Sequence, residues 1–211
     1  MMRSNPSLRW LMVALAFLAT MLNYLDRQTL SVSAPVLMDQ FRMDHQAYSY
    51  AVFAFMLAYT LGNGISGPLL DRLGTRLGFA LTMTWWSAAG MLNGLARGPW
   101  SLGAFQFLLG VGEAGNWPAS VKVVAEWFPT EERALASGIF NSGSATGAIL
   151  APPLVVWLLL HYGWRQAFVA TGLLGFIWIA IWSLLYYTPE EVKTQVKPPK
   201  VPYRETIRGN P

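Results

Sequence analysis

Four polar side chains interrupt an apolar stretch of the sequence that is long enough to cross a membrane. Between Trp10 and Met38 the only charged residues are Asp26 and Arg27, and Asn23 and Tyr24 come just before them. In a helix that starts at Trp10, Arg27 lies roughly 25 Å along the axis, well inside a hydrocarbon layer of about 30 Å. A charged side chain at that depth costs about 2.5–3.5 kcal/mol on insertion scales, and such residues normally face a protein interior or a watery cavity and carry function. The pattern therefore predicts a functional site inside the membrane.

The spacing of these residues assigns them to two directions. Asn23 and Arg27 are four residues apart and Tyr24 and Arg27 are three apart, so all three lie on one face of a helix. Asp26 lies about a quarter-turn away and can contact a different neighbour.

A second buried carboxyl, Glu113, lies in another apolar run. Small residues spaced by four surround it and provide a face for close helix contact: Gly110, Ala114 and Pro118. Burial in a low dielectric penalises the charged form of a carboxyl, which favours a proton-titrating role for Glu113. The alternative is a structural carboxylate that pairs with Lys122 or is capped by Asn116.

Transmembrane helices are the elements that must position these residues. The 211 residues are 54% hydrophobic and only 12% charged, which excludes an ordinary soluble domain. Six apolar blocks of about 20 residues or more predict six spans: 10–38, 48–69, 78–96, 100–125, 134–160 and 165–187. The fold class is therefore predicted as an all-α membrane protein, a bundle of six transmembrane helices.

Charge distribution sets the expected orientation. With the N-terminus inside, eleven Lys and Arg residues fall on the cytoplasmic side and three on the other, so both termini are predicted to be cytoplasmic. Residues 1–188 are expected to form the bundle, and residues 189–211 a Pro- and Lys-rich cytoplasmic linker or tail that is disordered.

Enzyme chemistry has no support in this sequence. There is no Cys, and the two histidines, His45 and His161, fall in predicted loops. No nucleophile–base pair, His cluster or metal-ligand spacing is found, so we predict neither an enzyme nor a metal site.

The loop between the second and third spans carries a motif of the form G-x-x-x-D-R-x-G-x-R. Its fixed positions are Gly67, Asp71, Arg72, Gly74 and Arg76. The glycines permit a tight turn, Asp71 can cap or pair near the start of the third span, and the arginines hold the loop in the cytoplasm. This motif resembles the signature of the major facilitator superfamily, in which the loop braces the cytoplasmic gate.

The fifth span is rich in small and polar residues between Asn141 and Gly147. Most of them are predicted to form a helix-packing surface. Asn141 and Ser144 are either contacts for sugar hydroxyls or part of that surface, and Tyr59 in the second span either lines a cavity or packs.

Three segments and one longer run narrow the resemblance. They are 23–27, 112–114, 126–133 and 138–157. Together they resemble the anion:cation symporter branch of the superfamily, and the last run is similar to bacterial hexuronate transporters; the likeness extends over residues 7–190. The resemblance implies that the chain is the N-terminal six-helix half of a twelve-span fold, built as a 3+3 inverted repeat.

The same resemblance implies roles for individual residues. Arg27 would bind the substrate carboxylate, Asp26 and Glu113 would be the protonatable pair, and sugar-contacting side chains fall on Tyr24, Tyr59 and Ser144. One departure is Gln106, which stands where the family usually has an Arg.

The function predicted on this basis is secondary active transport of a sugar-acid anion by alternating access. The expected substrate is a hexuronate such as glucuronate or galacturonate. A proton, or alternatively a sodium ion, would be the coupling ion, with no other cofactor. The expected partners are that anion, the lipid bilayer of a bacterial inner membrane and a second six-helix half that this chain lacks; nucleic acid is not expected. The alternative is a truncated membrane fragment that does not transport and acts as a partner or sensor protein.

Overall fold

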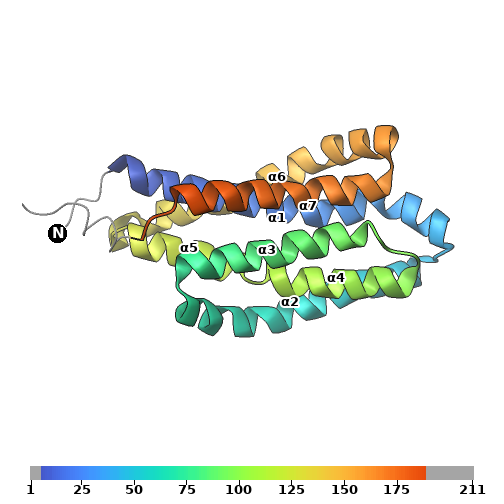
Figure 1. Ribbon diagram of the computed structural model, residues 1–211, viewed down its shortest axis with the longest axis horizontal. Coiled ribbons are helices and arrows are strands. Elements are labelled where there is room, and N and C mark those ends of the chain that lie inside the picture. Colours follow the sequence, from blue (N-terminus) through green and yellow to red (C-terminus); the bar gives the residue numbers. More distant parts are fainter. Residues whose placement is uncertain (1–5, 189–211) are drawn as a thin grey trace, which may run out of the picture.

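The structure, a computed structural model, describes residues 6–188, and within them the chain forms seven α-helices and one short 3-10 helix. The predicted tail at 189–211 lies outside the described residues. The helices run side by side along the long axis of the bundle (Figure 1). Their bounds are α1 Pro6–Phe41, α2 His45–Leu73, α3 Thr75–Asn93, α4 Pro99–Glu113, α5 Asn116–Trp127, α6 Arg133–Tyr162 and α7 Trp164–Leu185.

The seven helices make six crossings of the bundle, as the sequence predicts. Four candidate spans are each long and apolar enough to cross a membrane: α1, α2, α6 and α7. The third of these includes the 3-10 helix Thr130–Glu132 that precedes α6. Helix α3 is a fifth crossing. Helices α4 and α5 follow one another along the bundle and form the sixth (Figure 1).

The fourth span is broken, whereas the sequence predicted one helix over 100–125. Pro118 has no N–H, so the carbonyl of Ala114, four residues earlier, lacks its helical donor. The hydroxyl of Ser66 on α2 donates to that carbonyl at 3.2 Å. At Gly115 a Cβ atom would collide with the side chain of Thr82 on α3. The chain therefore turns at Ala114 and Gly115, directly after Glu113.

Helix pairing follows the inverted repeat. Helices α1–α3 form the first unit and α4–α7 the second, so α1 corresponds to α4 and α5, α2 to α6, and α3 to α7. The most extensive contacts are α1 with α6, α2 with α4, and α3 with α7. All three pairs join the two units. The first two are equivalent under this correspondence, and the third joins helices that correspond to each other.

Glycines allow two of these pairs to approach closely. On α6, a Cβ at Gly143 would collide with the carbonyl oxygen of Phe17, and one at Gly147 with that of Met21, both on α1. On α4, a Cβ at Gly110 would collide with the carbonyl oxygen of Phe55 on α2. The packing interpretation of the small residues in the fifth span is therefore confirmed for Gly143 and Gly147.

Candidate functional site

Arg27 and Glu113 form an ion pair within the bundle. The Nε atom of Arg27 on α1 donates to Oε2 of Glu113, the last residue of α4, at 2.6 Å. The Glu113 side chain is fully buried, whereas that of Arg27 is 23% exposed. The pair thus has a sealed carboxylate on one side and a partly open guanidinium on the other.

In the described part of the chain, the two partners expected for a structural Glu113, Lys122 and Asn116, make other contacts. Lys122 binds Asp71 instead, with Nζ 2.8 Å from Oδ1. The amide of Asn116 donates to the hydroxyl of Thr20 at 3.3 Å. Glu113 is therefore paired with the cation of the first span.

Three aromatic rings surround the Arg27 guanidinium. Its Cζ atom lies 4.4 Å from the ring centroid of Tyr59, 5.1 Å from that of Phe55 and 5.2 Å from that of Tyr24. Tyr24 and Tyr59 are half-buried, and Phe55 is 6% exposed. The structure thus places Tyr24 beside Arg27, as the helical spacing predicted, and also brings Tyr59 and Phe55 to it. The spacing of Phe55 and Tyr59, one helical turn apart, was the signal that could have identified Phe55.

Asp26 faces away from Arg27, in agreement with its quarter-turn offset. Its side chain is buried and interacts with Thr171 on α7 and, through space, with Glu113. Its Oδ1 atom has no hydrogen-bond partner among the described residues. The two carboxyls predicted as a protonatable pair therefore lie in the same buried region without touching the same cation.

Beside the ion pair lie two further buried polar atoms that have no hydrogen-bond partner of ordinary geometry within residues 6–188. They are Oε1 of Glu113 and Nδ2 of Asn23, which lies close to Glu113. Unpaired buried polar groups are costly and rare in proteins. Unpaired polar atoms of Asn23, Asp26 and Glu113 thus lie together around the ion pair.

The fifth-span candidates lie on α6 beside this region. Asn141 is exposed and Ser144 is half-buried, and the Ser144 hydroxyl donates to the Asn141 carbonyl at 2.7 Å. Ser144 precedes Gly147 by one turn, and Gly147 packs against Tyr24. Neither polar side chain has a contact with Arg27 among those of the described residues, so their role stays a prediction.

Gln106, which stands where the family usually has an Arg, takes part in a buried contact. Its Nε2 atom donates to Oδ1 of Asn93 on α3 at 3.0 Å. Both side chains are buried. The residue thus joins α4 to α3 away from Arg27.

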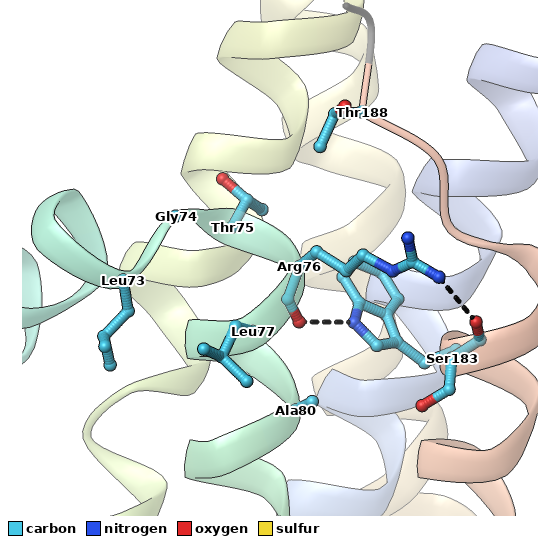
Figure 2. A pocket seen from close by; sticks show the side chains of 9 residues that line it. Leu73, Gly74, Thr75, Arg76, Leu77, Ala80, Ser183 and Thr188 are labelled. Atoms are coloured by element: carbon cyan, nitrogen blue, oxygen red, sulfur yellow. Dashed lines mark hydrogen bonds between the residues drawn. The ribbon is translucent and has the colours of Figure 1, made fainter. Parts of the chain in front are cut away.

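The motif between α2 and α3 is tied to two other helices. Asp71 belongs to α2 and does not cap α3, whose first turn follows Gly74 at a φ of +76°. Its salt bridge to Lys122, which also donates to the Leu70 carbonyl at 3.1 Å, fastens the end of α2 to α5. Arg76 lies at the start of α3 (Figure 2) and donates to the Ser183 carbonyl at 3.0 Å. The expected pairing of Asp71 is therefore with α5.

Of the remaining motif positions, Arg72 is exposed and Gly67 half-buried with open space around it. A shallow hollow lies between the start of α3 and the end of α7 and includes Gly74, Arg76 and Ser183 (Figure 2). The indole of Trp182 donates to the Arg76 carbonyl at 2.9 Å.

Glu126 on α5 is a second fastening point, and sequence reasoning gave it no role. Its carboxylate accepts the hydroxyl of Thr75 on α3 and, at 2.9 Å, that of Tyr186 just after α7. Burial, with the negative charge of Glu126 adding to it, raises the pKa of Tyr186 above its usual value. The higher pKa favours the neutral phenol, which is the form that donates to Glu126.

The fold and sequence of this chain are similar to those of known transporters. A family model described as "Major Facilitator Superfamily" matches residues 16–211. The chain is 42% identical to the "Hexuronate transporter" of Escherichia coli (strain K12) over 192 residues, which cover 91% of this chain and 44% of that protein. It is 38% identical to the "Galacturonate transporter" of Dickeya chrysanthemi over 186 residues, 88% of this chain and 54% of the relative.

A solved structure shares the fold. It is a bacterial homologue of the human lysosomal transporter Spinster in an inward-facing, unoccupied conformation, with a TM-score of 0.78 and 24% sequence identity. The match covers 89% of this chain and 45% of that one. The chain thus spans about half the length of the proteins that it matches, and these proteins are transporters rather than enzymes. On the family match and the six-crossing helical fold, this chain is a multi-pass membrane protein that belongs to the major facilitator superfamily.

Proposed function

We propose that this chain forms the N-terminal half of a secondary transporter that moves a sugar-acid anion together with protons. The observation that carries the proposal is the Arg27 guanidinium, which is charged, partly open and neutralised by the fully buried Glu113. The names of the relatives support the substrate class, since they include transporters for hexuronate and galacturonate. A hexuronate anion is therefore the substrate that we assign.

Substrate binding begins at Arg27. A guanidinium has five N–H donors in a planar fork, and Glu113 engages only the Nε side. The two Nη groups can hold a carboxylate in a bidentate pair, which is among the stronger hydrogen-bonded contacts in proteins. Tyr24 and Tyr59, half-buried beside the fork, can accept and donate hydrogen bonds to sugar hydroxyls, as can Ser144 and Asn141 from α6.

Proton coupling follows from charge balance at the ion pair. With Glu113 ionised, a second carboxylate on Arg27 would bring two negative charges to one cation. A proton on Glu113 removes that repulsion, so proton and substrate each favour the binding of the other. Asp26, buried on the next face of α1, is the second proton site that we assign.

Transport requires a second six-helix bundle opposite this one. Throughout, the complete carrier means this chain together with that second half, embedded in a bacterial inner membrane with both termini of this chain in the cytoplasm. The two halves rock about the site in alternating access, and the ties of α5 to α2, α3 and the end of α7 brace the cytoplasmic side.

Uptake by the complete carrier in proteoliposomes tests this function. Labelled glucuronate is supplied outside with an inward proton gradient, and Arg27→Ala is expected to reduce uptake to that of empty vesicles. Arg97→Ala, which changes an exposed arginine in the loop before α4, is the matched control and retains uptake. Normal uptake by the Arg27→Ala carrier would remove the proposed role of Arg27, and no uptake by the unmodified carrier would overturn the proposed function.

A further inference from the structure

Phe55 contacts the guanidinium of Arg27 but has almost no access to the open side of the site. Phe55 is 6% exposed, and its ring centroid lies 5.1 Å from the Cζ atom of Arg27. It also stacks on Tyr59 at 5.9 Å with an interplanar angle of 16°. A substrate held by the open edge of Arg27 therefore meets Tyr24 and Tyr59 first, and Phe55 lies behind them.

The close approach of α2 and α4 places Phe55 at this position. Gly110 lies against the carbonyl of Phe55, where any larger residue would collide. Gly110 also precedes Glu113 by one turn of α4. The same backbone contact therefore sets the position of the ring and that of the carboxylate relative to Arg27.

Two kinds of partner neutralise or attract the Arg27 cation. Glu113 is the only carboxylate that forms a salt bridge with it within residues 6–188, and that partner is lost to a proton or displaced by a substrate carboxylate. The aromatic rings attract a cation through their quadrupoles and cannot be protonated away. They are thus the contacts that persist while Glu113 changes its charge.

We propose that Phe55 is a positioning residue that, with Tyr24 and Tyr59, holds the Arg27 guanidinium in its binding orientation when Glu113 is protonated. This inference rests on the proposed function. Without the Phe55 ring, Arg27 depends more strongly on ionised Glu113, so proton uptake by Glu113 becomes less favourable. Loss of the ring should therefore weaken substrate binding and move the pH dependence of uptake toward lower pH.

Asp26 is the one other charged group of the described residues near the pair, and it acts on Glu113 through space. Asp26 on α1 faces α7, and α2 and α3, which pack against α4, carry no charged side chain within the bundle interior. The charged residues of α6 and α7 lie toward the helix ends. On α5, Lys122 is paired with Asp71, and Glu126 accepts the hydroxyls of Thr75 and Tyr186. The titratable groups beside Arg27 and Glu113 are thus Asp26, Tyr24 and Tyr59.

Fluorinated phenylalanines at position 55 of the complete carrier separate the ring's charge distribution from its volume. Progressive fluorination weakens the attraction of the ring for a cation while its shape changes little. We expect the KM for glucuronate to rise with each fluorine and to reach roughly threefold to tenfold with three, at nearly unchanged kcat. The midpoint of the pH dependence should move to lower pH by about half a unit to one unit, which is the decimal logarithm of the expected threefold to tenfold rise in KM.

Three substitutions complete the experiment. Phe55→Leu should raise the KM and move the pH midpoint in the same way as the fluorinated residues. Phe55→Tyr, which keeps an aromatic ring, should keep the KM and pH midpoint of the unmodified carrier. Phe53→Leu on the exposed face of α2 should change neither quantity. A constant KM and an unmoved pH profile across the fluorinated series would overturn the inference, because the ring would then serve only to fill space. That result is distinct from failure of the proposed function, in which the unmodified carrier does not take up glucuronate or Arg27→Ala leaves uptake intact.

Discussion

Arg27 and Glu113 join corresponding helices of the two inverted units, with Nε of Arg27 on α1 2.6 Å from Oε2 of Glu113 on α4. A buried pair of this kind is poor evidence of stability, because desolvation of both charges offsets much of their attraction. Removal of one partner is costly, since it leaves the other charge buried and unpaired. A pair that must sometimes separate therefore needs a replacement for each partner, and a proton for Glu113 and an external carboxylate for Arg27 meet that need.

Glu113→Gln imitates the protonated carboxyl and should uncouple transport from protons. The amide keeps an oxygen that can accept from Arg27 but cannot bind or release a proton. We expect proton-driven accumulation of glucuronate to fall by about tenfold or more, while counterflow, which needs no net proton movement, stays within about threefold of the unmodified carrier. Both are measured in proteoliposomes with the complete carrier.

The control for this prediction is Glu131→Gln, which removes an exposed carboxylate in the short helix before α6. It should leave accumulation and counterflow unchanged. Full proton-driven accumulation by the Glu113→Gln carrier would contradict the coupling role of Glu113.

Much of the bundle could be predicted from the sequence, because block length and the polar interruption of α1 are local signals. Six crossings follow from runs of apolar residues, and the separate directions of Asp26 and Arg27 follow from the 100° turn per residue of a helix. The helix-packing role of Gly143 and Gly147 follows from small residues spaced by four.

The remainder depends on contacts between residues that are distant in sequence. The pairing of Glu113 with Arg27 rather than Lys122 is decided by which helices meet, and so is the proximity of Phe55 to Arg27. The break after Glu113 could have been predicted from Pro118, because its missing N–H leaves the Ala114 carbonyl without a helical donor. That the hydroxyl of Ser66 donates to this carbonyl could not be predicted without the fold. The two hydroxyls on Glu126 likewise come from α3 and from the residue after α7.

Tyr186→Phe should change the alkaline stability of the bundle. Burial and Glu126 raise the pKa of Tyr186 in the folded chain, whereas an unfolded tyrosine titrates near pH 10. The stabilisation from the neutral phenol is therefore present below about pH 10 and is lost as the pH rises further. We expect Tyr186→Phe to unfold more easily by about 1–2 kcal/mol at pH 8, with a smaller difference from the unmodified chain at pH 11.

Thermal unfolding in detergent between pH 8 and 11 measures this difference. Tyr187→Phe is the matched control, since the neighbouring phenol is 38% exposed, and it should follow the unmodified chain at every pH. A deficit of Tyr186→Phe that stays the same from pH 8 to pH 11 would show that the phenol does not titrate differently in the folded state.

Gly143→Leu should destabilise the bundle by forcing α6 away from α1. A side chain at this position meets the carbonyl of Phe17, which belongs to a helix backbone and cannot rotate aside. Overpacking of this kind costs about 1–3 kcal/mol. Gly138→Leu on the same helix enters open space and replaces a poor helix former, so it should be neutral or stabilising by up to about 1 kcal/mol. Unfolding of the full chain by titration with a denaturing detergent compares the two, and equal midpoints would mean that α1 and α6 are not in close backbone contact.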